Sequence, residues 1–183
     1  GSVGSPLPLH ELRIVDDTLQ EVPAGIVGEI MGRGPILMPG YHRQPGLTQA
    51  AIVDGWLRTG DLGFVDEAGY LHLVDRQKDL IISGGVNVYP RDIEEIITRH
   101  PAVREAAVFG APHPRWGESP IAAVLLKAGA VIEADQLREW VNANVAARFQ
   151  RITGLRIHRD FPRNAAGKTL KRELRASHLS HGA

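Results

Sequence analysis

The stretch Asp75–Pro90, with the sequence DRQKDLIISGGVNVYP, separates two parts of the chain that have different residue patterns. Before it, short segments of alternating apolar and polar residues are separated by turn residues, as in antiparallel β-structure. After it, apolar segments of strand length alternate with segments of helical periodicity, which is typical of an α/β or α+β domain. A domain boundary is therefore predicted near Asp75–Lys78.

The part before Asp75 is predicted to consist of strands and one short helix. Strands are expected at residues 12–15, 26–31, 64–65 and 70–74, and the helix at residues 46–52. Asp66–Gly69 has the composition of a hairpin turn between the last two strands. These strands are too few to close a barrel alone, so this part of the chain should expose apolar surface. Pairing of two copies in a homodimer would cover that surface.

The part after Asp75 is predicted to contain strands and three helices. The first helix begins at Pro90, because proline suits the first helical position and isoleucines follow at helical spacing. The other two helices are expected at residues 135–149 and 170–179. Strands are expected at residues 80–82, 103–109, 121–126 and 155–158.

The composition excludes several classes of protein. The 183 residues contain no cysteine, which excludes disulfides and thiolate metal sites, and the eight histidines show no paired ligand spacing. No metal site is therefore predicted. No apolar run is long enough to cross a bilayer, and the N-terminus lacks a secretory pattern. A cytoplasmic location and no transmembrane segment are expected.

The formal net charge is zero, but the charge is distributed unevenly. Arg148–Arg175 contains nine Lys or Arg residues and two acidic residues, and so carries a charge of +7. Such a segment favours an anionic partner such as a nucleotide, the phosphates of CoA or a nucleic acid, and a solvated basic face explains it equally well. Nucleic-acid binding is not predicted, because only Phe149 and Phe161 could supply stacking platforms there.

Three motifs follow one another along the chain: Trp56–Leu62 (WLRTGDL), Asp75–Pro90, and Phe161–Arg175 (FPRNAAGKTLKRELR). In this order they resemble the closing third of the adenylate-forming (AMP-binding) enzymes. That superfamily includes the acyl-CoA synthetases, the adenylation domains of nonribosomal peptide synthesis and firefly luciferase. The segment IISGGVNVYP is more similar to fatty-acyl and aryl CoA ligases than to peptide adenylation domains. The resemblance covers nearly all of the chain.

The resemblance implies an α+β fold with two parts. Residues 1–75 would be the end of the large N-terminal domain and would supply strands of its β-barrel subdomain. Residues 76–183 would be the mobile C-terminal lid domain, a small antiparallel sheet with flanking helices. The chain has no Ser/Thr/Gly-rich loop ending in lysine, which such enzymes use to hold the ATP phosphates. We therefore expect a fragment that is inactive in isolation.

Asp61 and Arg76 are the candidate residues for binding ATP and the adenylate. A short carboxylate can accept hydrogen bonds from both hydroxyls of a ribose, and Gly60 permits a close approach of the sugar. The resemblance assigns this contact to Asp61, and it places Arg76 near the ribose and phosphate, where a permanently charged guanidinium suits anionic oxygens. The structural alternatives are a turn-stabilising aspartate and a charged linker.

The resemblance makes Lys168 the catalytic residue of adenylation. Gly167 permits a turn that projects this ammonium towards the negative charge that develops between a carboxylate and the α-phosphate of ATP. Lys78 occupies the hinge position, at which the small domain rotates between two half-reactions. For both residues the structural alternative is a solvated lysine on the surface.

Gly84 and Gly85 match the loop that lines the passage for the pantetheine arm of CoA. Two glycines leave no side chains in a narrow passage, and a tight turn is the structural reading of the same residues. Ile82 stands where some relatives, luciferase among them, carry a second functional lysine. The role of that lysine is therefore not transferred to this chain.

The complete protein is therefore expected to be an AMP-forming acyl-CoA synthetase. It would convert a carboxylic acid, ATP and CoA into acyl-CoA, AMP and pyrophosphate through an acyl-adenylate, with Mg²⁺ screening the phosphates. Its missing partner would be the N-terminal adenylating domain. The alternative is a non-catalytic lid or interaction module that docks on a separate adenylating domain. The sequence does not identify the acid.

Overall fold

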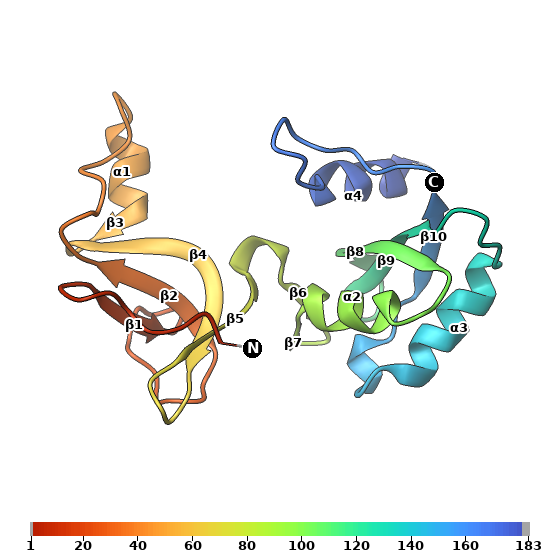
Figure 1. Ribbon diagram of the computed structural model, residues 1–183, viewed down its shortest axis with the longest axis horizontal. Helices are drawn as coiled ribbons and strands as arrows, with labels where there is room; N and C mark the ends of the chain where they lie inside the picture. Colours follow the sequence, from red (N-terminus) through yellow and green to blue (C-terminus); the bar gives the residue numbers. More distant parts are fainter. Residues whose placement is uncertain (1, 181–183) are drawn as a thin grey trace. The chain divides into compact units, whose positions relative to one another are not determined.

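The computed structural model describes residues 2–180, which divide into two compact units between Lys78 and Asp79 (Figure 1). Each unit contains one five-stranded sheet. A single turn of 3₁₀-helix, η1 (Gln77–Asp79), lies at the division. Within the described residues, no helix combines the length and the apolar character that crossing a bilayer demands.

The first unit is an antiparallel sheet with the strand order β1-β2-β4-β3, in which β5 also pairs with β4. Its elements are β1 (Glu11–Val15), β2 (Gly28–Arg33), α1 (Pro45–Ala51), β3 (Ile52–Val53), β4 (Trp56–Val65) and β5 (Leu71–Arg76). The predicted hairpin turn connects β4 to β5, and the Asp66 carboxylate accepts hydrogen bonds from the N–H groups of Ala68 and Tyr70. The buried apolar residues are Ile14, Val15, Ile30, Met31 and Leu62.

The segment Thr59-Gly60-Asp61 is a bulge inside β4, which begins at Trp56 and not at residue 64, where the strand is expected from the sequence. The register between β2 and β4 shifts here, so that this segment lies opposite Ile30 alone. Gly60 adopts φ +70°, a region that favours glycine. The Thr59 hydroxyl donates to the Ile30 carbonyl at 2.7 Å and accepts from the Asp61 N–H at 3.1 Å. These contacts hold the bulge in shape.

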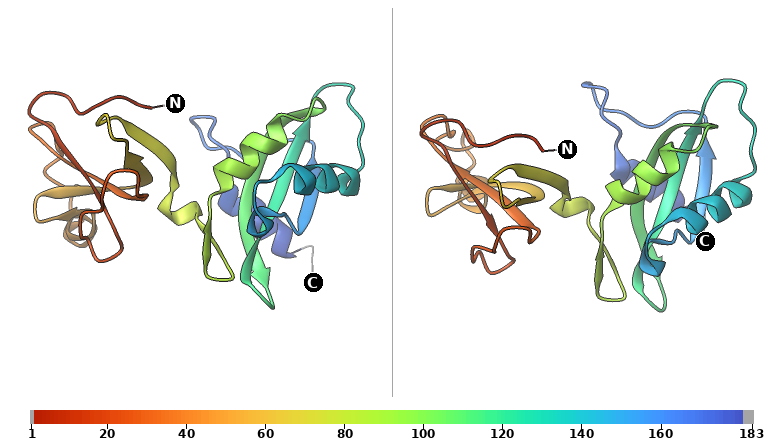
Figure 2. Two further views of the ribbon diagram at one scale, coloured as in Figure 1. Left: turned by 90° about the horizontal axis from the view of Figure 1, so that it is seen from below. Right: turned by 60° about the horizontal axis from the view of Figure 1, so that its bottom comes forward.

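The second unit is a sheet with helices on both faces (Figures 1 and 2). Its elements are β6 (Ile81–Ser83), β7 (Val86–Val88), α2 (Pro90–Thr98), β8 (Val103–His113), β9 (Gly117–Leu126), α3 (Ala134–Asn144), η2 (Arg148–Gln150), β10 (Gly154–His158) and α4 (Lys171–Ser180). The predicted α+β class is confirmed. The sheet is antiparallel except for the parallel pair of β9 and β10, whose connection contains α3, as parallel strands require.

Side-chain alternation along β8 and β9 creates two cores on opposite faces of the second sheet. Against one face pack the isoleucines of α2 and the apolar side of α3; this core includes Ile93, Ile97, Leu137, Val141, Val108, Ala122 and Val124. On the other face lie α4 and the segment before it; this core includes Leu174, Phe161, Phe109, Ile121, Ala123 and Leu125. Because both faces are buried, the central strands are apolar along most of their length.

Helix α3 ends at Asn144, so the prediction of a helix over 135–149 is wrong at its C-terminal end. The Asn142 side chain donates to the Ile152 carbonyl at 2.9 Å and accepts from the Ile152 N–H at 2.8 Å. Val145 then adopts extended backbone, with ψ 144°. The contact with a distant residue therefore outweighs the local helical periodicity. Helices α2 and α4 begin within one residue of the predicted positions.

Gly84 and Gly85 form the two-residue turn of a hairpin between β6 and β7. Their φ angles are +58° and +80°. Two successive positive φ values are typical of a type I′ turn, which matches the twist of the flanking strands. No strand was predicted at Val86–Val88, because the short segment was interpreted only as part of a loop.

Candidate functional site

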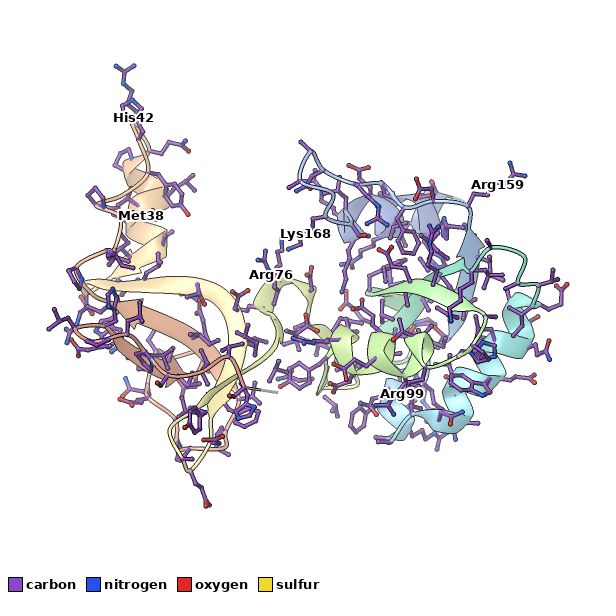
Figure 3. All side chains as sticks on the ribbon, in the orientation of Figure 1. Met38, His42, Arg76, Arg99, Arg159 and Lys168 are labelled. Carbon is purple, nitrogen blue, oxygen red and sulfur yellow. The ribbon has the colours of Figure 1, made fainter. Side chains whose placement is uncertain are left out.

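Asp61 and Arg76 lie opposite each other on the paired strands β4 and β5. The Nε atom of Arg76 is 3.2 Å from Oδ1 of Asp61. Both side chains are partly exposed, at 35% for Asp61 and 46% for Arg76, so both remain accessible to a ligand. Figure 3 labels Arg76 at the end of β5. The structure thus joins the two predicted adenylate-binding residues in one ion pair, while their role stays a prediction.

A buried carboxylate supports the bulge that carries Asp61. The Glu29 side chain is 4% exposed and accepts hydrogen bonds from Nε and Nη2 of Arg58, at 2.9 and 2.7 Å. Its other oxygen accepts a longer hydrogen bond from the Gly60 N–H, at 3.3 Å. Neither Glu29 nor Arg58 is a candidate from the sequence alone. The available signal was an acidic residue within the apolar segment 26–31.

Lys168 lies on a hairpin, Pro162–Leu170, just before α4 (Figure 3). The Asn164 N–H donates to the Lys168 carbonyl at 3.0 Å, and the Asn164 side chain accepts from the N–H groups of Ala166 and Lys168 at 3.0 and 2.9 Å. Gly167 adopts φ +79°, as such a turn requires. The backbone of Lys168 is therefore held, whereas its side chain is exposed and makes no hydrogen bond or ion pair within residues 2–180.

Several basic residues near Lys168 are paired with acids elsewhere in the second unit. These pairs are Arg163 with Glu105, Lys171 with Glu94, and Arg175 with Glu118. They attach the C-terminal segment to β8, α2 and β9. Part of the basic charge found in the sequence is thus neutralised inside the unit, and this part is not available to an anionic partner.

Glu105 is ionised at neutral pH. Burial, the largest single influence, would raise the pKa of its carboxyl group. Hydrogen bonds from Arg163 and Thr169, with the positive charges of Arg163 and Arg104, outweigh burial and hold the pKa below its ordinary value. The pKa of Arg163 is in turn raised, chiefly by its hydrogen bond to Glu105.

Lys78 is the last residue of the first unit, and its side chain is exposed in η1. No hydrogen bond or ion pair of this side chain occurs within the described part of the chain. A change of backbone torsions at Lys78 would therefore break no side-chain contact among these residues. The hinge role stays a prediction.

The turn at Gly84 and Gly85 lies against the side chain of Trp116. A Cβ atom at Gly84 would lie 3.0 Å from the Trp116 ring, whereas one at Gly85 would meet nothing within 4 Å. The Gly84 N–H donates to the Trp116 carbonyl at 2.8 Å. Positive φ thus favours glycine at both positions, and at Gly84 a Cβ atom would also crowd the Trp116 ring. Ile82, where some relatives carry lysine, is 54% exposed.

The described residues offer no site for the Mg²⁺ that the resemblance implies. Nowhere in residues 2–180 do three or more His, Asp or Glu side chains lie where they could hold a metal ion. Because Mg²⁺ is usually held by substrate phosphates with one or two carboxylates, this part of the protein is not expected to bind the ion without ATP.

Comparisons with known proteins identify the family. Residues 92–168 match the family described as AMP-binding enzyme C-terminal domain, and residues 1–42 match the family described as AMP-binding enzyme. A 2-succinylbenzoate–CoA ligase of Bacillus cytotoxicus is 44% identical over 175 residues. The match covers 96% of this chain and 36% of that relative, so the chain spans little more than a third of such a protein.

Solved structures agree with this assignment. The amide bond synthetase McbA from Marinactinospora thermotolerans is 42% identical with a TM-score of 0.86, over 96% of this chain and 36% of that one. The o-succinylbenzoate CoA synthetase of Bacillus subtilis, in complex with its acyl-adenylate intermediate, is 38% identical with a TM-score of 0.87, over 95% and 35%. The chain therefore belongs to the adenylate-forming (AMP-binding) enzymes and holds their C-terminal domain.

Proposed function

We propose that the complete protein is an AMP-forming acyl-CoA synthetase. In the first half-reaction a carboxylate oxygen of the acid attacks the α-phosphorus of ATP, and the bond to the β-phosphate breaks to release pyrophosphate. In the second half-reaction the CoA sulfur, having lost its proton, attacks the acyl carbon, and AMP leaves. The similarity to a CoA ligase along almost the whole chain supports both steps.

The observation that carries this proposal is the exposed ammonium of Lys168 on a hydrogen-bonded hairpin. An ammonium is a compact charge that can stabilise the oxygens of the α-phosphate as negative charge develops on them. The nearest basic residue on each side of it along the chain, Arg163 before and Lys171 after, is already paired with a carboxylate. Lys168 is thus free to interact with a nucleotide, and we assign it the catalytic role in adenylation.

The remaining predicted residues fit supporting roles. Asp61 would accept hydrogen bonds from the ribose hydroxyls, and Arg76, which contacts it at 3.2 Å, would approach the ribose and phosphate. Gly84 and Gly85 would line the passage for the pantetheine arm, and Lys78 would be the hinge at which the C-terminal domain changes orientation. Only the backbone of these last three residues is needed for such roles.

The partners of this function are the carboxylic acid, ATP, CoA and the N-terminal adenylating domain. Mg²⁺ would accompany ATP and be held chiefly by its phosphates, because no cluster of three metal-ligating side chains occurs in the described residues. The expected cytoplasmic location and the homodimer stay predictions. The alternative function, a lid that docks on a separately encoded adenylating domain, is distinguished by an assay of acyl-CoA formation. Such a lid would give acyl-CoA only after the second chain is added.

The change Lys168→Ala in the complete protein tests the catalytic assignment. Adenylation of the acid should slow by about 10²- to 10³-fold, because a preorganised positive charge is lost from the transition state. The rate of thioester formation from preformed acyl-adenylate should fall by about threefold at most. Single-turnover assays of each half-reaction measure the two rates.

Lys127→Ala is the matched control, because Lys127 is also an exposed lysine of the second unit but lies on the loop before α3. This control should leave both half-reactions unchanged. Equal losses in both half-reactions for Lys168→Ala would reject the assignment of Lys168 to adenylation.

Amide formation is a second candidate for the second half-reaction. The similarity to an amide bond synthetase, at 42% identity, favours it. An amine would then attack the acyl carbon of the adenylate in place of the CoA sulfur. To discriminate the two, preformed adenylate is mixed in parallel with CoA and with each of a panel of amines. Faster formation of acyl-CoA supports the synthetase, whereas faster formation of an amide supports an amide-forming enzyme instead.

A further inference from the structure

We propose that Glu105 is the positioning residue that holds Lys168 in place for adenylation. This inference rests on the proposed function, because it assumes that Lys168 acts on the nucleotide. Glu105 lies on β8, far from Lys168 in sequence, and neither composition nor motif identified it. It does not itself touch a substrate in this proposal, and acts through the hairpin Pro162–Leu170.

The carboxylate of Glu105 accepts hydrogen bonds from both strands of that hairpin. Arg163 and Thr169 are paired across it in an antiparallel bridge. Oε2 of Glu105 accepts a hydrogen bond from Nη2 of Arg163 at 2.5 Å, and Oε1 accepts one from the Thr169 hydroxyl at 2.8 Å. Arg163 also donates to the Gly167 carbonyl at 3.1 Å, next to Lys168. Glu105 therefore contacts Thr169 directly and Gly167 through Arg163, and these are the residues on either side of Lys168.

A bulge in β8 is the reason that Glu105 faces the hairpin. Val103 is buried in the core shared with α2 and α3, whereas Ala107 is buried in the core shared with α4. With strict alternation Val103, Glu105 and Ala107 would share one face of the sheet. The register between β8 and β9 shifts between Val103 and Glu105, leaving Arg104 as the extra residue. The shift moves Glu105 to the face on which the C-terminal segment lies.

The electrostatics of this contact suit an anchor that stays formed at neutral pH. The side chains of Glu105 and Arg163 are about equally accessible, at 33% and 34%, so the pair is only partly solvated. Charge-assisted hydrogen bonds of this kind are shorter and stronger than neutral ones. Because the Lys168 side chain has no partner within residues 2–180, the position of its ammonium depends on how firmly its backbone is held.

The test uses Glu105→Gln in the complete enzyme. The amide replaces one of the two carboxylate oxygens with an NH2 donor and removes the negative charge, so Arg163 and Thr169 no longer each face a separate acceptor oxygen. Adenylation should slow by about 10- to 100-fold, the effect of a displacement on the order of 1 Å. Thioester formation from preformed adenylate should be unchanged. Hydrogen exchange of the amides at residues 164–168 should accelerate.

Three further variants separate positioning from general stabilisation. Glu118→Gln removes a different ion pair of the same C-terminal segment, the one to Arg175 at 2.7 Å, without touching the hairpin. It should leave both adenylation and hairpin exchange unchanged. Thr169→Ser keeps the hydroxyl that reaches Glu105 and should behave as the unchanged enzyme, whereas Thr169→Val should resemble Glu105→Gln.

A double variant decides whether Glu105 acts through Lys168. With Lys168→Ala already present, Glu105→Gln should slow adenylation by less than about twofold further, because the group that it positions is gone. A full additional loss would overturn the proposal, and so would unchanged hairpin exchange or unchanged adenylation in Glu105→Gln alone. If Lys168→Ala alone leaves adenylation intact, the assigned function of Lys168 fails instead, and the exchange data still report whether Glu105 anchors the hairpin.

Discussion

Glu29 is the charged residue that is most deeply buried in the described part of the chain, and it contacts both Arg58 and the bulge that carries Asp61. The two residues differ in access to water, because the Arg58 side chain is 35% exposed and that of Glu29 is 4% exposed. Removing a partner therefore has unequal consequences. A stranded Arg58 can turn towards water, whereas a stranded Glu29 remains buried without compensation.

The change Arg58→Met should lower the free energy of unfolding by about 3 kcal/mol, because it leaves a buried carboxylate without its cation. Glu29→Gln should cost only about 1 kcal/mol, because an amide oxygen can still accept from Arg58. Urea unfolding of the two variants of the complete protein measures both values. Equal costs would show that the pair does not hold the bulge in the way described.

Helix α4 packs on the second face of its sheet through apolar and histidine side chains. Leu174 is buried, and the His178 ring centroid lies 6.0 Å from that of Phe109. Nδ1 of His178 is buried and has no hydrogen-bond partner among residues 2–180. Burial first, and the charge of Arg156 second, lower the pKa of both His158 and His178. Both rings therefore stay neutral at pH 7.

The lowered pKa values predict a pH dependence of stability. Below the ordinary histidine pKa of about 6.5 the unfolded chain takes up protons that the folded chain resists. The contribution of the two rings is therefore complete above that pH and is lost as the pH falls through their folded pKa values. The urea midpoint should fall between pH 7.5 and pH 5.5, and it should fall less in His178→Phe. Exposed His42 supplies the control, since His42→Phe should leave the pH dependence as it was.

The molecule as a whole is divided at Lys78, with a separate sheet and a separate core on either side. A hinge between two such units needs only the backbone torsions of a few residues to change. The single turn η1 at the division has no buried residue, so little packing resists that change. The proposed alternation between two half-reactions is therefore compatible with the way the chain is divided.

Lys78→Pro tests the hinge in the complete enzyme. Proline restricts φ at position 78 and also the conformation of Gln77 before it. The ratio of the two half-reaction rates should change by about tenfold or more, because a protein held near one arrangement can serve only one of them. Lys78→Ala keeps the torsions free and should leave the ratio unchanged. A proportional loss of both rates in Lys78→Pro would argue against a hinge at this residue.

Local sequence patterns predicted the secondary structure correctly where residues close together in the sequence determine it. Pro90 begins α2, Asp66 organises the hairpin between β4 and β5, and two adjacent glycines make the turn between β6 and β7. The failures occurred where distant residues intervene. Asn142 ends α3 early because its side chain bonds to the main chain beyond the helix, and Thr59 stabilises a bulge through a neighbouring strand.

By itself the sequence determined the family, the α+β class, the order of the motifs and the identity of the candidate residues Asp61 and Lys168, because these depend on residue type and short spacing. Only the tertiary structure decided which carboxylates support them. Glu29 and Glu105 reach their partners through strand register and bulges that involve residues far apart in the chain. A shift of one residue in either register would turn these side chains to the opposite face, and no local pattern encodes that choice.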